Sequence, residues 1–137
     1  MDNDENKEAE EEKDEIVEDI MQDESARDLI ANLDQCYEEC VSGITHCLDQ
    51  GGDFVEKDHL RWLMDCADIC KIAQNFFLRD SEYAGDMLSL CAFICDDCAE
   101  SCEKFFNDQK MKDCAMACRN CADVCRNMID LEEEEEK

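Results

Sequence analysis

Four segments of the chain repeat one pattern, in which cysteines or a Gly, Ala or Phe occupy offsets 0, 4, 7 and 11 and mostly polar residues lie between them. At about 100° per residue in an α-helix, these offsets bring the four side chains within an arc of about 60°. The pattern therefore predicts four amphipathic helices, each with one inward face. We call the following 16 positions the cysteine stripe: Cys36, Cys40, Gly43 and Cys47; Cys66, Cys70, Ala73 and Phe77; Cys91, Cys95, Cys98 and Cys102; Cys114, Cys118, Cys121 and Cys125.

The residues that interrupt this pattern predict where the helices begin and end. Ser25 is a suitable cap for the first helix, and Gly51 and Gly52 end it. Asp53 followed by Glu56 resembles a capping box at the start of the second helix. The chain contains no proline. The predicted helices span residues 26–48, 54–78, 82–106 and 109–130. Joined by short turns, they predict an all-α fold, an antiparallel up-down-up-down four-helix bundle with a cysteine-lined core.

Acidic segments flank this single predicted domain of residues 26–130. Residues 1–25 hold 13 Asp and Glu against two Lys, and residues 132–136 are all Glu. Charge repulsion in such segments outweighs the little apolar surface they can bury. We therefore expect residues 1–25 and residues 131–137 to be disordered acidic tails.

The charge of the chain argues against several classes of partner and location. A formal net charge of -26 repels nucleic-acid backbones and anionic membrane surfaces, so neither is an expected partner. No run is long and apolar enough to span a bilayer. Residues 1–7 lack the basic start and apolar stretch of a secretory signal, and we expect a cytoplasmic protein with reduced thiols.

The 13 cysteines are better suited to binding metal than to forming disulfides. Their number is odd, and β-carbons at helix positions i and i+4 lie about 5–6 Å apart, whereas a disulfide needs about 3.8 Å. An isolated buried cysteine often acts only as a small apolar residue. Thirteen on the inward face of four helices favour a soft metal ion instead, above all Cu(I), with zinc and iron–sulfur clusters as alternatives.

The arrangement of the thiols favours copper among these metals. Structural zinc needs four ligands in a tetrahedron, whereas one helix offers i, i+4 pairs in a line. One Cu(I) per thiolate leaves the core neutral, whereas four thiolates around Zn(II) leave two negative charges. Ferredoxin motifs contain a proline, which this chain lacks. An iron–sulfur electron carrier and a zinc-binding structural bundle remain open. The predicted Cu(I) pairs are Cys36/Cys40, Cys66/Cys70, Cys91/Cys95, Cys98/Cys102, Cys114/Cys118 and Cys121/Cys125, with Cys47 sharing ions with its neighbours.

Three cysteine-rich segments carry a family resemblance. Residues 66–70, 91–102 and 114–128, the last two with the motif C-x3-C-x2-C-x3-C, resemble the bacterial copper storage proteins. The resemblance implies a homotetramer of four-helix bundles, each holding many Cu(I) ions along its axis, and a storage or detoxifying role. The sequence shows no convincing nucleophile–base pair, so we do not expect an enzyme. Copper buried in this way would leave by exchange with a stronger thiol carrier or chelator.

The predicted antiparallel topology sorts candidate entry ligands to one end of the bundle. His59 and Met111 can both ligate Cu(I) and lie close to the stripe, so we predict them as entry ligands. Leu29, Leu33 and Phe77 are expected to close the other end. The entry end is predicted to contain Cys47, His59, Cys66, Cys102, Met111 and Cys114.

Two features near that end depart from the stripe or from the family. His46 lies off the stripe and is expected at the surface. Family members often carry histidines in the loop before the last helix, whereas residues 105–109 of this chain are Phe-Phe-Asn-Asp-Gln. The histidine entry gate that the resemblance would imply therefore has no counterpart in this predicted loop.

Overall fold

The structure is a computed structural model and describes residues 15–19 and 22–136. The described residues are almost entirely helical, which confirms the all-α prediction. A short helical segment at residues 15–19 precedes the main elements. These are α2 (Glu24–Gln50), the 3-10 helix η1 (Gly52–Val55), α3 (Lys57–Leu78), α4 (Ala84–Glu103) and α5 (Gln109–Glu136).

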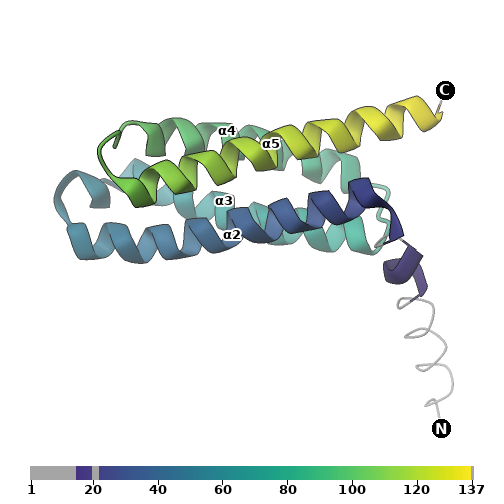
Figure 1. Ribbon diagram of the computed structural model, residues 1–137, viewed down its shortest axis with the longest axis horizontal. Helices are drawn as coiled ribbons and strands as arrows, with labels where there is room; N and C mark the ends of the chain where they lie inside the picture. Colours follow the sequence, from purple (N-terminus) through teal and green to yellow (C-terminus); the bar gives the residue numbers. More distant parts are fainter. Residues whose placement is uncertain (1–14, 20–21, 137) are drawn as a thin grey trace, which may run out of the picture.

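The four long helices lie side by side in a bundle (Figure 1). Helix α2 packs against α3 and α5, and α4 packs against the same two helices, so the four enclose one core. Short connections join successive helices, and their directions therefore alternate. η1 and the connection at 104–108 lie at one end, which we call the η1 end, while the start of α2 and the end of α5 lie at the other, the terminal end.

Helices α2, α3 and α4 begin at residues other than those the sequence predicted, α4 at Ala84 rather than at 82. The carboxylate of Asp23 accepts a hydrogen bond from the Ser25 N–H at 2.9 Å, so Asp23 caps α2 and Ser25 does not. Helix α3 begins at Lys57 rather than at 54, because residues 52–55 form η1. Glu56 is its cap and accepts a hydrogen bond from the His59 N–H at 3.2 Å.

Parts of the two segments predicted as disordered acidic tails are helical in the structure. Helix α5 continues to Glu136, well past the expected end at 130, because glutamate favours helix and no breaking residue intervenes. Most of the predicted tail at 1–25 lies outside the described residues, and residues 15–19 within it are helical and exposed. Helix α4 is shorter than predicted, at 84–103.

Sulfur fills the centre of the bundle. All 13 cysteine side chains are fully buried, as the helical arithmetic predicted. Leu29 and Leu33 are also fully buried and Phe77 is nearly so, and they pack at the terminal end of the column. Among the described residues, none of the helices combines the length and the apolar character needed to cross a membrane.

Candidate metal centre

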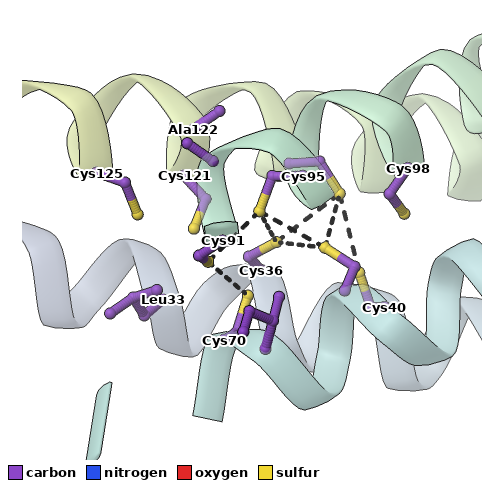
Figure 2. Close-up of a cluster of buried hydrophobic side chains, with 14 of the residues drawn as sticks. Leu33, Cys36, Cys40, Cys70, Cys91, Cys95, Cys98, Cys121, Ala122 and Cys125 are labelled. Carbon is purple, nitrogen blue, oxygen red and sulfur yellow. Dashed lines mark hydrogen bonds between the residues drawn. The ribbon is translucent and has the colours of Figure 1, made fainter. Parts of the chain in front are cut away.

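Sulfur atoms from different helices meet along the bundle axis. The Sγ atoms of Cys66 and Cys95 are 3.6 Å apart, those of Cys36 and Cys66 are 3.7 Å apart, and those of Cys36 and Cys118 are 3.8 Å apart. Figure 2 shows thiols from facing helices pointing toward one another in this region. All 13 cysteines are free thiols, as predicted. The centre of the bundle is therefore a continuous set of sulfur ligands.

Ten of the cysteines form four overlapping groups in which four Sγ atoms lie within 4.8 Å of one another. Each group draws its thiols from three helices. The remaining three cysteines, Cys47, Cys102 and Cys125, are buried outside these groups. The groups are Cys36, Cys40, Cys66 and Cys118; Cys36, Cys66, Cys70 and Cys95; Cys40, Cys98, Cys114 and Cys118; and Cys70, Cys91, Cys95 and Cys121.

These groups correct one step of the sequence argument, which treated each helix as offering only linear pairs. Thiols from neighbouring helices complete sets of four, and in a tetrahedral zinc site with Zn–S bonds of about 2.3 Å the sulfurs would be about 3.8 Å apart. The observed separations of 3.6–4.0 Å are of that size. Ligand geometry within one helix therefore does not exclude zinc.

The sharing of thiols between groups distinguishes the metals instead. Cys36 and Cys66 belong to two groups, and so do Cys40 and Cys118. Only two of the four groups can be filled at once without sharing a thiol. Zinc bound by unshared thiolates would thus occupy at most two of the groups. Filling all four groups at once requires bridging thiolates, and monovalent ions balance their charge without leaving a net negative core.

Two of the buried thiols, Cys47 and Cys70, hold their protons more strongly than a free cysteine does. Burial, together with the nearby Cys114, raises the pKa of the Cys47 thiol to about 11. A hydrogen bond with Cys121, together with burial, raises the pKa of Cys70 above its usual range. These two thiols are therefore neutral near pH 7.

Cys47, His59 and Met111 come together at the η1 end. The Nε2 atom of His59 is 3.5 Å from Cys47 Sγ, and that sulfur is 3.8 Å from Met111 Sδ. His59 is 3% exposed and Met111 is fully buried. Cys66, which the sequence placed at this end, lies instead beside Cys36 near the middle of the column, so that part of the prediction was wrong.

The orientation of His59 depends on Ser101, a residue that sequence reasoning missed. The Nδ1 atom of His59 lies 2.7 Å from the Ser101 hydroxyl oxygen, which leaves Nε2 directed at Cys47. Burial lowers the pKa of His59, so the ring is neutral and can act as a ligand. Such outer hydrogen bonds commonly orient metal-binding histidines.

His46 lies at the surface, as the sequence predicted, but its side chain is partly buried and has a hydrogen-bond partner. Its Nε2 atom is 2.9 Å from the Asp108 carboxylate, and its side chain is 25% exposed. It lies next to Cys47 in the sequence but makes its contact across the η1 end, with the connection between α4 and α5.

A helical bundle whose core is a continuous column of free thiols defines a class of metal-binding proteins that take soft ions into their interior. Residues 22–130 match the family model of the copper storage proteins (Csp). The chain belongs to the copper storage protein family. This agrees with the resemblance seen in the cysteine motifs.

Individual relatives share both sequence and fold with the chain. The uncharacterized cysteine-rich protein YhjQ of Bacillus subtilis (strain 168) is 34% identical over 93 residues, which are 68% of this chain and 85% of YhjQ. The crystal structure of Nmul_A1745 from Nitrosospira multiformis is 41% identical, with a TM-score of 0.73 over 80% of this chain and 98% of that one. The Cu(I)-bound copper storage protein BsCsp3 from Bacillus subtilis is 30% identical, with a TM-score of 0.73 over 77% and 99% of the two chains.

Proposed function

We propose that this protein stores Cu(I), with many ions bound by the 13 cysteines inside the bundle. One observation carries the proposal: every cysteine is buried, and ten of them form groups that share thiols. Thiolates are the ligands that Cu(I) prefers. A set of thiols shared between groups suits a cluster of monovalent ions. The role of the protein in this proposal is storage of the metal rather than catalysis.

Charge supports copper over the alternatives. Four thiolates around each Zn(II) would place two negative charges in a core where, among the described residues, no Lys or Arg is buried, whereas equal numbers of Cu(I) and thiolate are neutral. The relative BsCsp3 is described as Cu(I)-bound. Neither an iron–sulfur electron carrier nor a zinc-binding structural bundle has comparable support from the family.

His59 and Met111 are the entry ligands in this proposal, with Cys47 as the first thiol. Cys47 Sγ lies 3.5 Å from His59 Nε2 and 3.8 Å from Met111 Sδ, at one end of the sulfur column. An ion bound there could pass to deeper thiols by ligand exchange. At the terminal end, by contrast, Leu29, Leu33 and Phe77 pack over the column.

Assembly, location and exchange partner complete the proposal. The protein acts in the cytoplasm, where thiols stay reduced. It assembles as a homotetramer, as the family resemblance implies, and exposed apolar side chains such as Phe93 and Met116 offer surface for such contacts. Copper leaves by transfer to a thiol carrier. The net charge of -26 argues against nucleic acid and anionic membranes as partners.

Anaerobic titration of the reduced apoprotein with Cu(I), against a competing chelator, tests the storage role. We expect binding to continue to about one ion per thiol, since Cu(I) balances thiolate one to one. A parallel titration with zinc should stop at two ions or fewer in the thiol groups. Copper binding that also stops at two or three ions would contradict storage.

A further inference from the structure

Two phenylalanine rings cover the candidate entry site. Phe54 of η1 and Phe105 of the α4–α5 connection stack with ring centroids 4.4 Å apart and planes inclined by 22°. The Phe105 ring also lies 4.7 Å from the His59 ring. His59 is almost completely buried, and the Phe105 ring is one of the side chains that cover its ring.

His46 and Asp108 connect the two phenylalanine-bearing segments to the helices of the bundle. One carboxylate oxygen of Asp108 lies 2.9 Å from His46 Nε2, and the other accepts a hydrogen bond from the Met111 N–H at 2.9 Å. The His46 and Phe54 rings pack nearly perpendicular to each other, with centroids 5.7 Å apart. These contacts connect α2, η1 and the start of α5 around the entry site.

Glycines give η1 a point at which it can pivot. Gly51 and Gly52 have φ angles of 70° and 57°, which favour glycine, and a Cβ at either position would meet no atom within 4 Å. The backbone here is thus not wedged against the bundle. Phe54 is the η1 residue that packs against the hydrophobic core and stacks on Phe105, so we expect its loss to loosen the short helix.

We propose that Phe54 and Phe105 form a lid over Cys47, His59 and Met111, and that copper enters and leaves when this lid opens. This inference rests on the proposed storage function and adds control of the rate at which copper enters and leaves the bundle. The lid sets how fast copper exchanges, while the thiols set how much is bound. Bulky chelators and carriers depend on opening more than small ligands do.

Removal of copper from loaded protein tests the lid in Phe54→Ala and His46→Leu variants. The probes are bathocuproine disulfonate, which is bulky, and cyanide, which is small. The stacked aromatic contact stabilises the closed lid. Losing it should therefore raise the rate of copper removal by the bulky chelator about two- to tenfold. Removal by cyanide should change less. Phe76→Ala is the matched control, because this ring lies on α3 near the terminal end, beneath the Arg79 guanidinium, and the variant should behave as the unchanged protein.

A measurement on the unchanged protein keeps the test independent of folding defects in the variants. If lid opening limits removal, the rate should level off at high bathocuproine disulfonate concentration, and Phe54→Ala should raise that limit. Equal limits in a variant that is folded by circular dichroism would overturn the lid, as would a rate that rises linearly throughout. Copper capacity, measured in the same samples, reports on the storage function separately.

Discussion

The Nδ1 atom of His59 on α3 lies 2.7 Å from the hydroxyl oxygen of Ser101 on α4. Both side chains are buried, so this contact is shielded from competing water. It fixes the ring with Nε2 toward Cys47, the first thiol of the column. One hydroxyl on a neighbouring helix thus positions the only imidazole that contacts a cysteine among the described residues.

Replacing Ser101 with Ala should slow Cu(I) loading without changing capacity. The His59 ring would lose its orienting partner, and loss of such partners typically weakens metal binding about 10- to 100-fold at the affected ligand. Stopped-flow loading from a Cu(I) chelator complex measures the rate. Ser42→Ala, at an exposed serine on α2, is the control.

A double variant separates positioning from simple loss of packing. If Ser101 acts through His59, then Ser101→Ala should add no further slowing to the His59→Ala variant. Independent, additive effects would argue against the positioning role. Loading at the unchanged rate in His59→Ala would remove His59 itself from the entry pathway.

Cu(I) loading at neutral pH should release protons. The Cys47 thiol, with a pKa of about 11, is protonated at pH 7 and must lose its proton to bind copper as a thiolate. Raising the pH therefore favours binding until the free thiols themselves ionise. Titration in a pH-stat should record about one proton per thiol that becomes a ligand. Loading without proton release would mean that thiolates are not the ligands.

The burial of the thiols could be predicted from sequence, whereas their neighbours could not. Offsets of 0, 4, 7 and 11 fix which face of a helix carries Cys36 or Cys66, because helical geometry is local. The stagger between helices is set by tertiary packing. For that reason Cys66 joined the entry end in the sequence analysis but lies beside Cys36 in the structure.

The parts of the η1 end that sequence reasoning missed share a physical cause. Phe54 and Phe105 lie in connections, where no periodic pattern marks a contact partner. Ser101 precedes Cys102 and only faces His59 once α3 and α4 are packed together. Its small polar side chain, immediately beside a predicted ligand, was the one available signal.

The apoprotein should be folded near neutral pH and lose stability in alkaline solution. Folding raises the pKa of Cys47 from 9.0 to about 11, so the folded state holds this proton more tightly than the unfolded state. The resulting stabilisation is complete below about pH 9 and is lost as the pH rises toward 11. Urea denaturation of reduced protein, followed by circular dichroism, measures this loss. The Cys47→Ala variant should lose less stability over that range, and an equal loss would assign the effect to other groups.

Gly43 is the one stripe position on α2 without a side chain, and replacing it with alanine should stabilise the apoprotein. A Cβ there would lie 3.5 Å from Met111 Cε and 3.7 Å from Leu63 Cδ2, which are ordinary contacts. Alanine is favoured over glycine within a helix by about 1 kcal/mol, so the free energy of unfolding should rise by about 0.5–1 kcal/mol. Gly52→Ala is the informative contrast, because its φ of 57° strains any residue with a side chain and should destabilise the protein. Chemical denaturation of both variants measures the difference. A destabilised Gly43→Ala variant would show that the Met111 side chain cannot accommodate even one methyl group beside the entry site.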